Sequence, residues 1–218
     1  MGFIVVRGTG ERIDVGKIVA AGQNYADHTK EMGARPSKTP ILFLKPATSI
    51  IHQGEPIVFP SAGALLHHEV ELGVVVARDC KDVAAAQAEG VMFGYLLALD
   101  LTLRDLQADA KRKGHPWSIA KGFDCSCPVS EVVPLGRSSV LDDMEIGLRV
   151  NGEVRQNATT ADMLWGPAEL LSIASGFFTL ERGDILLTGT PAGVGPLERG
   201  DTVDAWLGSE LSVRFIVS

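Results

Sequence analysis

Residues 65–76, LLHHEVELGVVV, place two histidines and two glutamates inside an otherwise apolar run. Side chains alternate between the two faces of a strand, so Glu69 and Glu71 share one face with His67, while Val70 lies on the core face. The two carboxylates have Cβ atoms about 7 Å apart. They raise each other's pKa unless a positive charge lies between them. The stretch therefore predicts a core strand that carries a cation-binding pair.

The rest of the chain predicts a β-rich α+β fold. Many short apolar runs are bounded by Gly, Pro and Asp, and helices do not alternate strictly with them, which disfavours a doubly wound sheet. Asn151-Gly152 has the composition of a type I′ hairpin turn. We expect strands at 3–6, 17–22, 41–46, 56–60, 71–77, 94–102, 145–156, 183–190, 201–207 and 211–217.

Fewer segments have helical patterns. We expect helices at 83–90, 102–114 and 166–177, with Pro167 at the start of the last and Gly176 after its end. A shorter helix is expected within 22–33, where Asn24 is a suitable N-cap and Gly33 a suitable terminator.

Composition limits the class of partner. The chain has 218 residues, with 20 Lys and Arg against 27 Asp and Glu, for a net charge of −7. This acidic balance disfavours nucleic acid and anionic membrane as partners. The three cysteines suit a reducing compartment. The N-terminus has no signal-peptide pattern, and no run has the roughly 18 apolar residues of a membrane span. We therefore expect a cytoplasmic protein.

A third carboxylate is expected near Glu69 and Glu71. Asp100 ends the apolar run 94–102, where a buried charge is costly unless it is paired or ligated. Three carboxylates favour Mg²⁺, Mn²⁺ or Ca²⁺ over zinc and leave positions for substrate oxygens. The alternatives are a solvated strand face for the glutamates and a helix cap for Asp100. His67 is a packed neighbour more readily than a ligand.

His28 and Glu31 are three residues apart in the short helix, so they lie on one face. A histidine oriented by a carboxylate is a general base that can take a proton from water. A helix of about two turns is marginal alone and could order over bound substrate as a lid. The alternative is an ordinary surface helix.

Several cationic and polar residues could contact a substrate. Arg104, Gln107 and Lys111 follow Asp100 at helical spacing, and Arg104 could bind a carboxylate bidentately. Lys121 lies between apolar residues and could stabilise an enolate. The glycine-rich loop 188–195 contains Thr190 and could hold a carboxylate. Solvated helix and surface positions are the alternatives.

Together these pieces resemble the fumarylacetoacetate hydrolase family over roughly residues 17–207. Each motif is modest alone, and the set is highly specific. The matching stretches are NYADHTKEMG, PILFLKP, HHEVELGVV, ALDLTLRDLQ, KGHPWSIAKGFD, CP at 127–128, VNGEVRQ and LLTGTPAGVGPL.

The resemblance implies roles for the site residues. By motif, the ligands of a Mg²⁺ or Mn²⁺ ion are Glu69, Glu71 and Asp100, and the water-activating dyad on a mobile lid is His28 with Glu31. The resemblance further implies Lys121 as the active-site lysine and Gln107 as the glutamine near the dyad. It implies Thr190 as the threonine that binds the substrate carboxylate, and Arg104 as a site arginine.

The resemblance also implies a rolled mixed β-sheet and a homodimer. We expect an N-terminal β segment at 1–16 and a single catalytic domain at 17–218. True fumarylacetoacetases carry an extra N-terminal domain that this sequence lacks. The chain is therefore more similar to the short acylpyruvase and oxaloacetate decarboxylase-type members.

From these residues and this resemblance we expect a divalent-metal-dependent enzyme that cleaves C–C bonds of acylpyruvates, with oxaloacetate decarboxylation as a related activity. The alternatives are a 2-hydroxyhepta-2,4-diene-1,7-dioate isomerase or decarboxylase, and an oxaloacetate keto–enol tautomerase. A non-catalytic protein that binds a metal and a keto acid is the alternative of another class.

Overall fold

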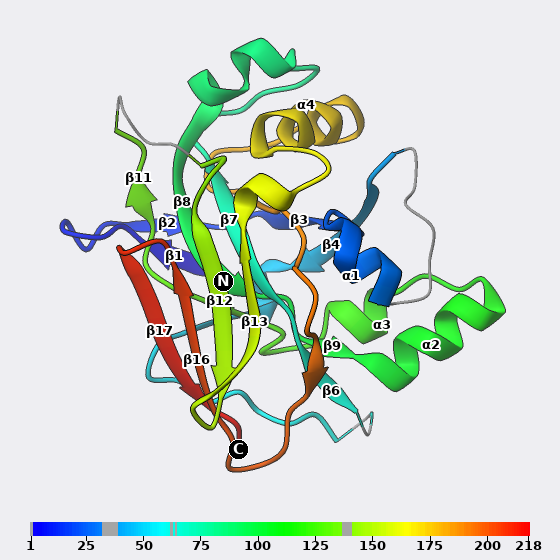
Figure 1. Ribbon diagram of the computed structural model, residues 1–218. Coiled ribbons are helices and arrows are strands. Elements are labelled where there is room, and N and C mark those ends of the chain that lie inside the picture. Colours follow the sequence, from blue (N-terminus) through cyan, green and yellow to red (C-terminus); the bar gives the residue numbers. More distant parts are fainter. Residues whose placement is uncertain (1, 32–38, 62, 64, 137–140) are drawn as a thin grey trace.

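The computed structural model describes residues 2–31, 39–61, 63, 65–136 and 141–218 (Figure 1). Its largest sheet is built around β7 (Val70–Val76), which pairs antiparallel with β8 (Met92–Leu99) and with β14 (Ile185–Leu187). The sheet is mixed, because β14 also pairs parallel with β3 (Lys17–Gly22). The remaining strands are β4 (Ile41–Pro46) beside β3, and β10 (Cys127–Val129), β5 (Ile50–His52) and β11 (Val133–Pro134) beyond β8.

A four-stranded antiparallel sheet packs against the large one (Figure 1). Its hairpin turns at Asn151 and Gly152, whose φ angles of 52° and 82° are those that a type I′ turn requires. The strands follow the order β13 (Glu153–Thr159), β12 (Glu145–Val150), β16 (Thr202–Leu207) and β17 (Leu211–Ile216).

Two smaller sheets complete the fold. One joins β15 (Gly195–Pro196), β6 (Leu66–His68) and β9 (Thr102–Leu103). The other is the antiparallel pair β1 (Phe3–Val5) and β2 (Arg12–Asp14).

The large sheet is buried on both faces. One face packs into a core that includes Leu72 of β7 and Leu148 of β12, and the other into a core that includes Leu96 of β8 and Ile4 of β1. Every residue of β7 is buried as a result. The predicted β-rich α+β class with a rolled mixed sheet is confirmed. The division into 1–16 and 17–218 stays a prediction, since residues of both segments share the second core.

The helices lie at the periphery of the sheets (Figure 1). α2 (Arg104–Lys113) ends at Gly114, whose φ of 67° makes the left-handed C-cap that its glycine predicts. α4 (Pro167–Phe177) starts with Pro167 as expected, but it continues through Gly176 and ends one residue later. The others are α1 (Ala26–Glu31), α3 (Ser118–Lys121) and the 3₁₀ helices η1 (Ala47–Ser49), η2 (Ala85–Val91) and η3 (Thr160–Asp162).

Two expected elements differ in the structure. The predicted helix at 83–90 is the 3₁₀ helix η2, whose first turn has no side-chain cap. The predicted strand at 56–60 is reduced to one bridge between Ile57 and Val217, because its two prolines lack the N–H groups of a ladder.

Asn24 is also not the cap of α1. Its buried side chain donates to the carbonyl oxygens of Trp165 and Thr188 at 2.9 and 2.8 Å and accepts from the Trp165 N–H. It therefore ties the start of α1 to the loop after β14. Gly33, the predicted terminator, lies outside the described residues.

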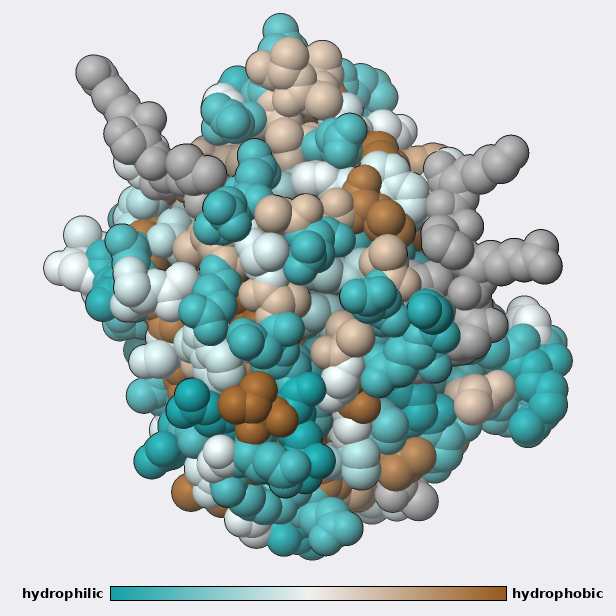
Figure 2. Space-filling view, viewed as in Figure 1, coloured by the Kyte–Doolittle hydropathy of each residue, from teal (hydrophilic) through white to brown (hydrophobic). Residues whose placement is uncertain are grey.

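On the face in Figure 2, apolar side chains are scattered among hydrophilic ones. Isolated apolar residues of this kind are normal on a protein surface. No helix among the described residues is long and apolar enough to cross a membrane.

Gly183 tests the packing of β2 against the large sheet. Gly183 and Gly200 have φ angles of 89° and 91°, so alanine at either position meets the same backbone cost. Only at Gly183 would the new Cβ lie 2.2 Å from a backbone oxygen, that of Asp14. We expect Gly183→Ala to lower the free energy of unfolding by about 1–3 kcal/mol more than Gly200→Ala, measured by urea denaturation. Equal decreases in the free energy of unfolding for the two variants would contradict the close packing of Gly183 against Asp14.

Candidate functional site

Three buried carboxylates meet where β7 and β8 pair. Glu69 immediately precedes β7, Glu71 is its second residue, and Asp100 immediately follows β8. The register sets them side by side, because Asp100 donates its N–H to the Glu69 carbonyl oxygen at 2.8 Å. One oxygen of each carboxylate lies within 4.8 Å of the others. Their exposed fractions are only 4, 2 and 1% for Glu69, Glu71 and Asp100.

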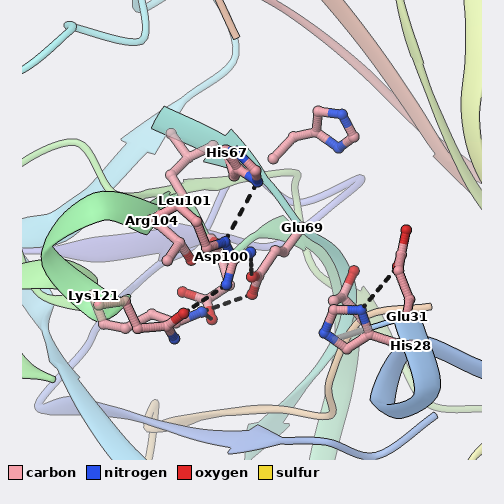
Figure 3. A network of polar contacts seen from close by, with 12 residues as sticks. His28, Glu31, His67, Glu69, Asp100, Leu101, Arg104 and Lys121 are labelled. Atoms are coloured by element: carbon pink, nitrogen blue, oxygen red, sulfur yellow. Dashed lines mark hydrogen bonds and ion pairs between the residues drawn. The ribbon is translucent and has the colours of Figure 1, made fainter. Parts of the chain in front are cut away.

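Three cations compensate these carboxylates (Figure 3). Lys121 Nζ donates to Glu69 at 2.7 Å and also to Asp100. Lys45 Nζ, on a fully buried side chain, lies 2.8 Å from Asp100 Oδ1. Arg104 pairs with the other oxygen of Glu69. The ion pairs bring α2, α3 and β4 to one point.

The carboxylates differ in their electrostatic surroundings. Burial would raise the pKa of Glu69, but Lys121 and Arg104 hold it well below its usual range. Burial, together with Asp100 and Glu69, raises the pKa of Glu71 well above its usual range, against the Gly189 N–H that donates to it at 2.7 Å. Negative charge is thus incompletely compensated at Glu71.

This donor set fits a divalent cation. The ligand atoms are all oxygens, which Mg²⁺, Mn²⁺ and Ca²⁺ prefer. They converge from three residues, and the excess negative charge at Glu71 is what such an ion would relieve. The grouping of Glu69, Glu71 and Asp100 is as expected from the sequence, while their role as ligands stays a prediction.

His67 lies outside the group of carboxylates (Figure 3). Its Nδ1 accepts a long hydrogen bond of 3.4 Å from Arg104 Nε. Burial and the Arg104 charge lower the pKa of His67 to about 4. The side chain therefore stays neutral near pH 7, beside the arginine.

His28 faces the carboxylates from α1, on the opposite side from Lys121 (Figure 3). Its Nδ1 lies 3.4 Å from Glu31 Oε2. Glu31 also accepts the Gly193 N–H at 3.1 Å, which ties the end of α1 to the loop after β14. Burial lowers the pKa of His28, although Glu69 and Glu31 oppose this shift. The ring is therefore a neutral base at pH 7.

These groups border one pocket. Of the predicted site residues, all except Glu31 line it, and Glu31 contacts the pocket-lining His28. Gln107 accepts a hydrogen bond of 2.6 Å from Arg104. The lining also includes Lys111, Trp117 and Phe43.

Thr190 is held in the pocket by Gln156, a fully buried residue of β13. The Gln156 amide donates to Thr190 Oγ1 and to the Pro191 carbonyl oxygen, both at 2.8 Å. Its oxygen accepts the Val70 N–H at 3.1 Å and contacts His68 Nδ1 at 3.0 Å. One side chain thus joins the four-stranded sheet, β7 and the Thr190 loop.

The sequence reasoning missed several of these residues. Lys45 could have been found, because a lysine inside the apolar run ILFLKP is costly to bury without a partner. Gln156 had no such signal, because it follows a turn in an ordinary hairpin. Phe43 and Trp117 are missed because aromatic residues are equally expected in a core.

Comparisons place this architecture among known proteins. A family model described as "Fumarylacetoacetate (FAA) hydrolase C-terminal" matches residues 17–215. The chain is 46% identical over 200 residues to oxaloacetate tautomerase FAHD1, mitochondrial, of Pongo abelii, covering 92% of this chain and 90% of that protein.

Solved structures agree with the sequence match. The fumarylpyruvate hydrolase of Pseudomonas aeruginosa in complex with Mn²⁺ and pyruvate is 35% identical, with a TM-score of 0.92 over 99% of this chain and 96% of that one. The 2-hydroxyhepta-2,4-diene-1,7-dioate isomerase of Mycobacterium marinum is 35% identical, with a TM-score of 0.81 over 96% and 81%. The similarity thus covers both the fold and nearly the whole chain.

The buried pair of Lys45 and Asp100 predicts a stability difference. Lys45→Met removes one partner of a buried ion pair, so we expect the free energy of unfolding to fall by about 3 kcal/mol or more. Arg214→Met breaks the exposed pair with Asp204, in which the Arg214 side chain is 68% exposed, and should lower the free energy of unfolding far less. Urea denaturation in EDTA measures both. If Lys45→Met lowers the free energy of unfolding no more than Arg214→Met does, the buried ion pair of Lys45 with Asp100 is contradicted.

Proposed function

The chain belongs to the fumarylacetoacetate hydrolase family, and we propose that it is a divalent-metal-dependent enzyme that interconverts the keto and enol forms of oxaloacetate. The observation that carries the proposal is the convergence of Glu69, Glu71 and Asp100 within 4.8 Å in a pocket that also contains His28. The 46% identity to a protein named oxaloacetate tautomerase supports this substrate.

Glu69, Glu71 and Asp100 would hold the ion, which we propose to be Mg²⁺, Mn²⁺ or Ca²⁺. When bound, such an ion acts as a Lewis acid that polarises the 2-oxo group of the substrate. The Mn²⁺ in the fumarylpyruvate hydrolase structure supports a divalent ion here.

His28 is the proposed proton carrier. Glu31 accepts from Nδ1–H and so leaves Nε2 as the unprotonated nitrogen. That nitrogen removes a proton from C3 of oxaloacetate to leave the enolate, and the imidazolium then gives the proton to the enolate oxygen to form the enol. Histidine suits both steps, since its two protonation states are close in free energy near neutral pH.

Cationic and hydroxyl groups orient the substrate. Lys121 lies beside Glu69 and Asp100, where its ammonium can stabilise the negative charge of an enolate. Burial lowers the pKa of Lys121, but Asp100 and Glu69 raise it above its usual value, so the side chain stays charged. Thr190 is the proposed contact for the substrate carboxylate, and Arg104 with Gln107 forms the adjacent wall.

Hydrolytic cleavage of acylpyruvates is the second candidate. The His28–Glu31 dyad favours it, because this pair can also deprotonate a water that attacks a distal carbonyl. The fumarylpyruvate hydrolase structure supports it. Oxaloacetate decarboxylation and diene isomerisation need the same stabilisation of negative charge on the 2-oxygen, and they remain related proposals. The non-catalytic alternative predicts metal and oxalate binding without turnover.

Two other expectations stay predictions. A homodimer is expected from the family, and light scattering measures it. The cytoplasmic location is also untested, and the relative from Pongo abelii is named mitochondrial.

Metal removal and loss of His28 test the mechanism. We expect EDTA to abolish conversion of enol-oxaloacetate, followed by ultraviolet absorbance, and Mg²⁺ or Mn²⁺ to restore it. His28→Ala should lower kcat about 10²–10⁴-fold. His115→Ala, an exposed histidine just beyond α2, should retain full activity.

The same proteins are assayed with acetylpyruvate. Faster turnover of acetylpyruvate than of oxaloacetate would replace the first candidate by the second. Full activity of His28→Ala on both substrates would exclude the proposed base.

The pH dependence follows from the lowered pKa of His28. The neutral ring is the active form, so kcat/KM should fall as the pH drops through a midpoint below the ordinary histidine value of about 6.5. Glu31 raises this pKa, so Glu31→Gln should move the midpoint to still lower pH. A midpoint that stays in place in Glu31→Gln would show that another group is titrating.

A further inference from the structure

Lys111 is a cation of the pocket that the proposed mechanism does not use. It lies on α2 and lines the pocket together with Glu69 and Lys121. Its Nζ sits 5.0 Å from the centroid of the Trp117 ring, which in turn packs against Phe43 at 5.8 Å between centroids. Lys111 is exposed while Glu69 and Lys121 are buried, so it marks the outer end of the pocket.

Lys111 differs from the other pocket cations in its partners. Arg104 is paired with Glu69, and Lys121 with Glu69 and Asp100. Within the part of the chain that the structure describes, Lys111 makes no ion pair with a carboxylate, and its Nζ contacts the Trp117 ring instead. Partial burial of the ammonium end, and then the Arg104 charge, lower the pKa of Lys111. An anion beside Lys111 would stabilise its charged form against both the partial burial and the Arg104 charge.

Charge balance favours a substrate with two negative charges. The three carboxylates of the pocket are matched by Arg104, Lys121 and Lys111. Behind this lining, Lys45 adds one positive charge and Glu31 one negative charge. A bound divalent cation therefore leaves the site with two positive charges, which a dianion neutralises and a monoanion does not.

We propose that Lys111 binds the distal carboxylate of the substrate, so that the pocket selects 2-oxo dicarboxylates over 2-oxo monocarboxylates. The proposal rests on the function proposed above, because it assigns the inner end of the pocket to the 2-oxo acid group. Trp117 and Phe43 form the apolar wall along the carbon chain between the two ends. Lys111 is thus a specificity-determining residue for that site.

A pair of ligands without a proton at C3 tests the proposal without keto–enol turnover. 3,3-Dimethyloxaloacetate has no proton at C3, and trimethylpyruvate replaces its distal carboxylate by a smaller, uncharged methyl group. Their dissociation constants are measured by calorimetry with Mg²⁺ present, for the wild type, Lys111→Met and Lys113→Met. Lys113 is the matched control on the same helix, paired with Asp109 at 2.8 Å and with its side chain 54% exposed.

We expect the wild type and Lys113→Met to bind the dicarboxylate more tightly than the monocarboxylate. Lys111→Met should weaken dicarboxylate binding about tenfold, the effect of one lost charge-assisted contact, and leave monocarboxylate binding unchanged. Lys111→Arg should restore the preference, and thermal melting checks that each variant is folded. In turnover, Lys111→Met should raise KM for oxaloacetate with kcat changed less than about twofold.

Two results would overturn the inference. One is that the wild type binds both ligands with equal affinity. The other is that Lys111→Met weakens the binding of both ligands by the same factor. The binding assay also separates the two proposals. A selective loss in Lys111→Met with no conversion of oxaloacetate by the wild type would support the role of Lys111 and reject the tautomerase.

Discussion

The concentration of three carboxylates in one buried space is the constraint on which the rest of the structure depends. Such a group is stable only when positive charge surrounds it. The chain supplies that charge from three separate elements: Lys45 from β4, Arg104 from α2 and Lys121 from α3. β4 is far in the sequence from α2 and α3, so these ion pairs hold separate parts of the periphery against the central strands. The ion pairs that compensate the site therefore also fix how these elements pack on the central strands.

The position of the carboxylates follows from sheet geometry. The pairing of β7 with β8 sets Asp100 beside Glu69, and alternation along the strand turns Glu71 to the same side. A shift of one residue in this register would move the carboxylates to the opposite face, into the apolar core. Burial of all of β7 between two cores prevents such a shift, because every residue of the strand is specified by its neighbours.

The sequence predicts the parts of the site that follow from local rules. Glu69 and Glu71 were found from alternation, and His28 with Glu31 from helical spacing, because those patterns depend on a few adjacent residues. Lys45 and Gln156 depend on partners 55 and 34 residues away, and no local rule reports such a contact. The same reason explains Asn24, whose partners lie 141 and 164 residues along the chain and outweigh its preference for a helix cap.

The ion pairs around the carboxylates also have a consequence for the order of folding and ion binding. In many small metal proteins the chain without its ion is unfolded, because the free energy of ion binding is what drives folding. Here the ion pairs of Lys45, Lys121 and Arg104 compensate Glu69 and Asp100 within the chain, and the charge of Glu71 is the part left for an ion. Most of the charge at the site is therefore compensated by the chain itself. Under the proposed function, metal supply would govern how many copies are active more than how many are folded.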